Sequence, residues 1–181
     1  MKILRAADHK RMPWKNGRGE TVEIAIFPQG ATVDTFDWRI SMATVSEDGP
    51  FSIFPGIDRT LSILEGESME LFVDGREAVT LTQAAAPYPF AADTPTTARL
   101  TGGPIADLNV MTRRGRFSHG VRKVAAPVTL QPDDGPLLVL CHRGQMRLQN
   151  EILRPLDCAI LDAGETADIS GDGAGFGTYL W

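Results

Sequence analysis

Hydrophobic and polar residues alternate in short runs along most of the chain, and glycine and proline separate the runs. In residues 20–27, for example, Val22, Ile24 and Ile26 fall on one side of an extended chain and polar or small residues fall on the other. Similar runs cover residues 37–45, 57–64 and 105–112. No segment keeps the 3.6-residue period of a helix over about eleven residues. The pattern therefore predicts an all-β protein built from short strands.

The spacing of these strands predicts how the chain divides. Short strands at close intervals, joined by glycine and proline turns, are typical of sandwiches and barrels. Both halves have similar strand density, and residues 113–120 are rich in arginine, glycine and serine, as expected of a boundary. We predict two stacked, jelly-roll-like barrels, one over residues 1–115 and one over residues 116–181. The two are expected to be closely packed, and shared strands remain an open alternative.

Turn residues predict how some strands are joined. Asp74-Gly75 separates the runs 69–73 and 76–82, which predicts a hairpin with a tight turn. In the C-terminal half a single strand is expected over residues 121–130.

Two of the strands carry an arginine among apolar residues. Arg39 shares a face with Ser41 in the strand 37–45, and Arg59 is in phase with Leu61 in the strand 57–64. In the strand 105–112, Asn109 lies on one face together with aspartate and methionine. A guanidinium inside a folded domain must be paired or reach water, because an unpaired buried charge is costly. The arginines therefore indicate a polar region in an otherwise apolar sheet.

Two interpretations of this arginine face stay open at the level of pattern. In the first, the side chains form a pocket for a small carboxylate, because arginine offers several donors in one plane and amides and hydroxyls fix orientation. In the second, the arginines brace the sheets through ion pairs with Asp37, Asp58 or Asp107. The pattern alone slightly favours the second interpretation.

Charge and composition exclude several classes of protein. The net charge is −5 and the sequence pI is about 5.2, whereas a nucleic-acid-binding protein would carry a basic stripe. The N-terminus has scattered charges and no apolar segment, so no signal peptide is predicted, and no run is long enough for a membrane helix. Cys141 and Cys158 lack CxxC spacing and are expected to be reduced and buried. A cytoplasmic protein with no nucleic-acid or membrane partner is expected.

Motifs for metal, phosphate and nucleophile chemistry are missing. The histidines are His9, His119 and His142, which are far apart and have no ligand spacing, so neither a metal nor a cofactor is predicted. There is no G-x-S-x-G elbow and no phosphate-binding glycine loop between a strand and a helix. Paired carboxylates, with Asp107 meeting Glu23 or Asp58 across strands, remain an alternative that would supply a general base.

Several long phrases of the sequence resemble a known family. PWKNGRGETVEIA, FDWRISMATVSEDGPFSIFPGIDRTLSILEG and DLNVMTRRG are similar to the HutD/Ves family of bicupin proteins, and the match covers roughly residues 12–115. The family's polar signature positions correspond to six candidate pocket residues: Asn16, Arg39, Ser41, Asp58, Arg59 and Asn109. The sequence departs from the family pattern at Arg18, where the family usually has glycine. This departure puts the role of the loop over residues 16–19 in doubt.

The resemblance implies a fold and a set of functions. It implies two cupin barrels without a standard metal motif, and an accessory or regulatory role in histidine utilisation for the HutD branch or in stress response for the Ves branch. We therefore expect a metal-free bicupin that binds a small anionic metabolite, such as urocanate or formyl- or formimino-glutamate. A metal-independent isomerase or hydrolase acting on similar acids, or a Ves-like interaction protein, is the alternative. Binding is favoured over catalysis, and a homodimer is a candidate assembly.

Overall fold

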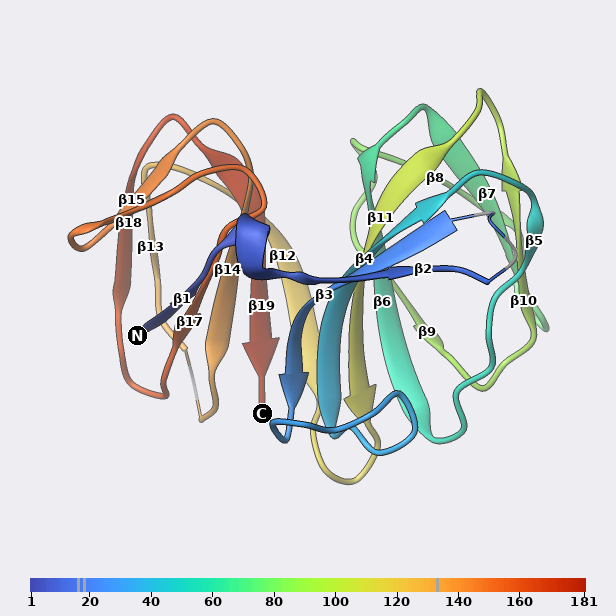
Figure 1. The fold of residues 1–181 in the computed structure, drawn as a ribbon, viewed down its shortest axis with the longest axis horizontal. Coiled ribbons are helices and arrows are strands. Elements are labelled where there is room, and N and C mark those ends of the chain that lie inside the picture. Colours follow the sequence, from blue (N-terminus) through green and yellow to red (C-terminus); the bar gives the residue numbers. More distant parts are fainter. Residues whose placement is uncertain (16, 18, 133) are drawn as a thin grey trace. The chain divides into compact units, whose positions relative to one another are not determined.

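The computed structural model describes residues 1–15, 17, 19–132 and 134–181, and these residues form strands along nearly the whole chain (Figure 1). Among the described residues the one helical element is a 3-10 turn, η1 (Ala6–Asp8). The alternating pattern of the sequence thus becomes an all-β fold, as predicted. Among the described residues, no helix is long and apolar enough to span a membrane.

Contacts along the chain separate it into two compact units. The first, here called the central barrel, comprises Lys10–Ser118. The second, the terminal barrel, combines Met1–His9 with His119–Trp181. The division differs from the predicted one at both ends: the later boundary falls three residues beyond 115, and the first nine residues join the C-terminal part of the chain.

The central barrel consists of a larger and a smaller antiparallel sheet. The larger sheet has, in spatial order, β2 (Lys10–Pro13), β3 (Gly19–Phe27), β4 (Trp38–Val45), β11 (Ile105–Arg113), β6 (Ile57–Glu65) and β9 (Tyr88–Ala91). The smaller sheet has, in spatial order, β5 (Gly49–Pro50), β10 (Thr96–Leu100), β7 (Ser68–Val73) and β8 (Val79–Thr82). The strands that carry Arg39 and Arg59 are separated by β11, so β11 is the centre of the polar region.

A hydrophobic core joins the two sheets of the central barrel. Leu61 and Ile63 of β6 contribute from the larger sheet, and Met69 and Leu71 of β7 contribute from the smaller one. All four side chains are almost completely buried. Each comes from the inward-facing set of an alternating strand.

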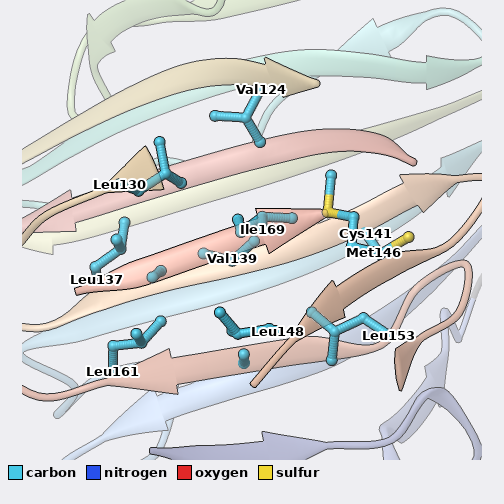
Figure 2. Close-up of a cluster of buried hydrophobic side chains, with 12 residues drawn as sticks. Val124, Leu130, Leu137, Val139, Cys141, Met146, Leu148, Leu153, Leu161 and Ile169 are labelled. Carbon is cyan, nitrogen blue, oxygen red and sulfur yellow. The ribbon is translucent and has the colours of Figure 1, made fainter. Parts of the chain in front are cut away.

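The terminal barrel also has a larger and a smaller sheet. The larger sheet has, in spatial order, β1 (Lys2–Leu4), β17 (Cys158–Leu161), β14 (Leu137–Arg143), β19 (Ala174–Leu180) and β12 (His119–Ala125). The smaller sheet has, in spatial order, β13 (Val128–Leu130), β18 (Ala167–Gly171), β15 (Met146–Leu148) and β16 (Glu151–Leu153). Figure 2 shows the side chains that fill the space between them, all of them apolar or thiol groups.

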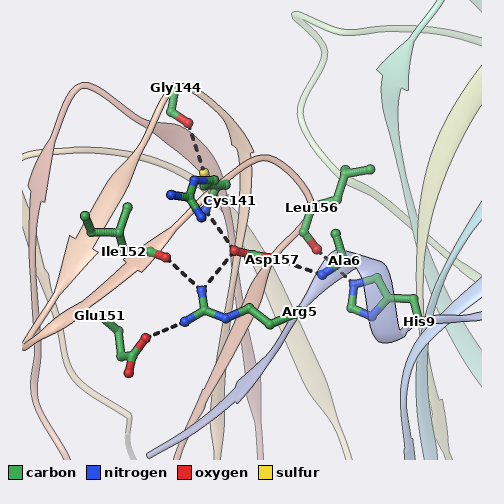
Figure 3. A network of polar contacts seen from close by, with 10 residues as sticks. Arg5, Ala6, His9, Cys141, Gly144, Glu151, Ile152, Leu156 and Asp157 are labelled. Carbon is green, nitrogen blue, oxygen red and sulfur yellow. Dashed lines mark hydrogen bonds and ion pairs between the residues drawn. The ribbon is translucent and has the colours of Figure 1, made fainter.

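An ion-pair network attaches the first residues of the chain to the terminal barrel (Figure 3). Arg5 donates to the carboxylates of Asp157 and Glu151, and the Ala6 backbone N–H donates to Asp157 Oδ1 at 2.9 Å. Burial opposes ionisation of Asp157, but these hydrogen bonds and one from the Arg154 backbone outweigh it and lower the pKa of Asp157. Together with the pairing of β1 and β17, the network explains why residues 1–9 belong to this unit.

Two details of the strand prediction were wrong. The predicted turn at Asp74-Gly75 is present, with the Arg76 N–H donating to Val73 O at 3.0 Å, but β8 begins at Val79 and not at residue 76, so the connection is longer than predicted. The strand expected over residues 121–130 is broken between β12 and β13 at Pro127, which cannot donate a backbone hydrogen bond.

Candidate ligand-binding site

Strand register aligns the polar residues of the central barrel in rows across its larger sheet. Met111 of β11 lies between Arg39 of β4 and Arg59 of β6. In the next row on the same face, Asn109 lies opposite Ser41. Directly opposed residues in antiparallel strands have Cβ atoms about 5 Å apart, so these side chains share one inward-facing surface. Arg39, Ser41, Arg59 and Asn109, which the sequence predicted as site residues, are therefore brought together on the core side of the sheet.

A cavity of about 520 Å³ opens beside this surface. Arg59, Asp107 and Asn109 line its sheet side. Strand β4 contributes Ala43 and Val45, and loop residues that include Trp14, Lys15, Glu47, Asp48 and Phe51 form much of the remaining wall. Its volume lies within the range of small-molecule sites, about 300–1,000 Å³, and its wall combines aromatic and charged groups as such sites do.

Arg59 is held by aromatic rings. Its guanidinium carbon lies 5.0 Å from the centroid of the Phe51 ring, 5.7 Å from that of Phe54 and 5.9 Å from that of Phe90. Such contacts favour a cation over an aromatic face by about 0.5–2 kcal/mol each. Burial lowers the pKa of Arg59 to about 10, although Asp107 opposes the shift, so the guanidinium remains charged at neutral pH.

The Arg59 guanidinium has unused donors. Its Nε and Nη1 atoms are buried and have no hydrogen-bond partner among the residues that the structure describes. Ordinarily more than about 90% of buried polar groups are paired, because an unpaired one loses its hydration without compensation. Arg59 therefore has two donor nitrogens, Nε and Nη1, that a ligand with acceptor atoms would satisfy.

Asp107 and Asn109 form a second polar group in the cavity wall. The Asn109 Nδ2 group donates to Asp107 Oδ1, while Asn109 Oδ1 is buried without a partner in the described part of the chain. Burial raises the pKa of Asp107 to about 7, although the charge of Arg59 and the Asn109 hydrogen bond favour its ionised form. The cavity thus contains one fixed cation, one carboxyl group that titrates near neutrality and one free amide oxygen.

Arg39 has a different environment from Arg59. Its Nε donates to Glu23 Oε2 at 2.8 Å, and both side chains are largely buried. The ion-pair interpretation therefore describes Arg39, but the partner is Glu23 and not one of the three expected aspartates. A register shift in β3 between Glu23 and Ala25 accompanies this arrangement. Neither Arg39 nor Ser41 is among the residues that line the cavity.

Asp58 does not join the group in the structure. Asp58 points to the opposite face of β6 from Arg59, where it accepts a hydrogen bond from Arg114 Nε at 2.8 Å. Arg114 also donates to Asp93, so Asp58 belongs to an ion-pair cluster outside the cavity. Asn16 and Arg18 lie outside the residues that the structure describes.

Some lining residues were not predicted as site residues. Asp107 was considered only as an arginine partner or a general base, and Phe51 was not considered. The alternation of β11 puts Asp107 on the same face as Asn109, which is a usable signal. Phe51 comes from the loop between β5 and β6, and no periodicity places a loop residue over a particular side chain.

Among the described residues, no group of three His, Cys, Asp or Glu side chains is placed to hold a metal ion.

A model of the HutD family matches residues 6–178. The chain belongs to the HutD family. This confirms the resemblance found in the sequence over roughly residues 12–115 and extends it through the terminal barrel. The family name describes relatedness and does not identify a ligand.

Named relatives are similar over much of the chain. An uncharacterised 21.2 kDa protein in the hutC 3′ region of Pseudomonas putida is 39% identical over 117 residues, which cover 65% of this chain and 60% of that protein. A Protein Ves from Cronobacter sakazakii is 34% identical over 152 residues, which cover 82% and 81%. The chain thus aligns with only about three-fifths of the P. putida protein.

Solved structures support the fold. HutD from Pseudomonas fluorescens SBW25 superposes with a TM-score of 0.87 at 31% identity, covering 99% of this chain and 98% of that one. YhhW from Escherichia coli, a pirin, superposes with a TM-score of 0.73 at 8% identity, covering 98% and 96%. At 8% identity, the similarity to YhhW shows only a shared fold. The predicted bicupin architecture is confirmed.

Proposed function

We propose that the cavity of the central barrel binds a small organic anion and that its carboxylate interacts with Arg59. The observation that carries the proposal is that two buried donor nitrogens of Arg59, Nε and Nη1, have no described partner beside a cavity of about 520 Å³. A carboxylate satisfies guanidinium donors with charge-assisted hydrogen bonds, which are roughly twice as strong as neutral ones. The phenylalanine rings around Arg59 restrict its motion and reduce the entropy lost on binding.

We further propose that the anion is a carboxylate of histidine degradation and that the protein has an accessory or regulatory role in histidine utilisation in the cytoplasm. Membership of the HutD family supports this, as does the P. putida relative named for its position in the hutC 3′ region. Urocanate, formimino-glutamate and formyl-glutamate all carry a carboxylate and are the first compounds to test.

Thermal unfolding and calorimetric titration with these three compounds test the proposal. A ligand present at a hundred times its Kd stabilises the folded protein by about 2.7 kcal/mol. Arg59→Met, which removes the charge and keeps much of the volume, is expected to abolish the effect. Arg99→Met is the matched control, because Arg99 also lies over a phenylalanine ring, Phe72, but outside the cavity. Unchanged binding in Arg59→Met would contradict the proposed site.

A specific observation also favours a second candidate function, metal-independent proton transfer. Asp107 lies in the cavity wall with its pKa raised by burial to about 7, where a carboxyl group both accepts and donates protons readily. The developing negative charge on a substrate carboxylate would be stabilised by Arg59. Deuterium exchange into the bound acids in heavy water, after chelator treatment, tests this function. Exchange that persists in Asp107→Asn would exclude Asp107 as the base.

A further inference from the structure

The cavity presents an acceptor as well as donors. Asn109 is only 4% exposed, and its Oδ1 atom has no partner among the described residues although it lies in the wall that also contains Arg59. This oxygen is out of contact with solvent in the free protein, and a ligand that satisfies Arg59 alone leaves it without a hydrogen bond. A ligand whose donor reaches it gains a hydrogen bond that a donor-free ligand does not, so the site favours donor-bearing ligands.

Asp107 determines which end of the Asn109 amide faces the ligand. An ionised carboxylate can only accept hydrogen bonds, so the amide must turn its NH₂ group toward Asp107. The Oδ1 atom then points away from Asp107 as an acceptor. The orientation of the amide is thus set by its neighbour before any ligand enters.

We propose that Asn109 determines the specificity of this site by selecting carboxylates that also carry an N–H or O–H donor able to reach its Oδ1 atom. This inference rests on the proposed function, because it assumes that a carboxylate occupies the position beside Arg59. It goes further in defining the ligand as an anion with a donor and in assigning the recognition of that donor to one residue. Simple acceptor-only anions are expected to bind weakly.

The selectivity has a pH dependence that follows from the same contacts. When Asp107 is protonated, its O–H can donate to Asn109 Oδ1, which allows the amide to turn and present NH₂ to the cavity. The preference for a donor-bearing ligand then disappears. The charged group that acts on Asp107 is Arg59 from β6, and Lys15, Glu47 and Asp48 line the other walls of the same cavity. Because burial raises the pKa of Asp107 to about 7, selectivity is expected above neutrality.

Matched pairs of small acids test the inference. In the first pair, urocanate has a ring N–H, and 3-(furan-3-yl)acrylate has the same shape without a donor. In the second pair, N-acetylglycine has an amide N–H, and acetoxyacetate has an ester oxygen in its place. Titration of the full-length protein with all four acids, followed by NMR or calorimetry, is done at about pH 8, where both Asp107 and the carboxylates are ionised.

Within each pair the donor-bearing acid is expected to bind about five- to a hundredfold more tightly, which is the range for one unsatisfied buried acceptor. In Asn109→Ala the two members should bind equally. Ser62→Ala is the matched control, since Ser62 Oγ is also buried without a described partner but Ser62 is not among the cavity-lining residues. If Asn109→Ala does not fold, Asn109→Ser, which retains a hydroxyl, is expected to give an intermediate ratio.

The outcomes separate this inference from the proposed function. Equal affinities within both pairs in the wild-type protein would overturn the role of Asn109 while leaving the carboxylate site in place. A preference that survives in Asn109→Ala would also overturn it. If none of the four acids binds at millimolar concentration, both the inference and the proposed function are wrong.

Discussion

Replacing Asp107 with asparagine is expected to change how the stability of the central barrel depends on pH. Asp107 is 1% exposed, and burial raises its pKa from the usual 3.8 to about 7. Between these values the folded protein holds a proton on Asp107 and the unfolded chain does not, so unfolding releases a proton. The free energy of unfolding therefore falls as the pH rises through this interval. Asparagine cannot titrate, so the substitution removes this contribution.

The size of the effect follows from the pKa. Each pH unit in which the folded and unfolded states differ by one proton changes the free energy of unfolding by about 1.36 kcal/mol. From about pH 5 to about pH 7 the wild type therefore loses roughly 2.3 kcal/mol that Asp107→Asn retains, slightly less than two full units because the folded-state carboxyl is half ionised at pH 7. Removing the carboxylate beside Arg59 also changes the free energy of unfolding by an amount that does not depend on pH in this range. This amount cancels, because only the change in the free energy of unfolding with pH is compared between the two proteins.

Urea unfolding at a series of pH values measures this difference. Trp14 and Trp38 lie in the central barrel, whereas Trp181 lies in the terminal barrel. A Trp181→Phe background therefore restricts the fluorescence signal to the central barrel. Parallel pH profiles for the wild type and Asp107→Asn would show that Asp107 does not titrate in this range and would refute the description of the cavity given above.

Three further experiments test packing within the two barrels. Phe51→Ala removes a ring that lies over Arg59 and should lower the free energy of unfolding by about 1–3 kcal/mol in urea titration; an unchanged midpoint would show that the ring contributes nothing. Gly66→Ala should cost at least about 1 kcal/mol because φ is +90° and a Cβ would lie 2.6 Å from Pro104 O, whereas Gly75→Ala, with φ +74° and open space, should cost less. Cys141 and Cys158 are buried, and burial raises the pKa of the Cys158 thiol to about 12, so Ellman's reagent should react only after unfolding; reaction of the native protein would contradict this burial.

The alternation of single strands predicted much of the central barrel. Arg59 among alternating aliphatics indicated an inward-facing cation, and the structure places it on the cavity wall. The same alternating pattern placed Asn109 on one face of the strand over residues 105–112. These predictions depended only on the period of two within each strand, which the sequence contains directly.

The pairing between distant strands was not predictable in the same way. β11 lies between β4 and β6, so the neighbours of Asn109 come from residues far away in the sequence. The pairing of β1 with β17 likewise joins Lys2 to Ile160, and nothing in residues 1–9 indicates that partner. Register depends on which strands meet, and a single strand's pattern does not contain that information.

Asp58 illustrates the limit of family signatures. It stands next to Arg59 in the sequence, so it points to the opposite face of the strand, where it pairs with Arg114. Because neighbouring residues of a strand point to opposite faces, the sequence itself indicated that Asp58 and Arg59 do not share a pocket. The side-chain geometry agrees with the alternation and separates Asp58 from the cavity.

A crystal structure of the protein with urocanate or formyl-glutamate bound is the most direct test of the central claim. A carboxylate oxygen is expected about 3 Å from Arg59 Nε or Nη1, the two donors that have no partner among the described residues. In the Arg59→Met variant, crystals grown under the same conditions should show no ligand in the cavity. A ligand that binds away from Arg59, or that occupies the cavity equally well in Arg59→Met, would contradict the account.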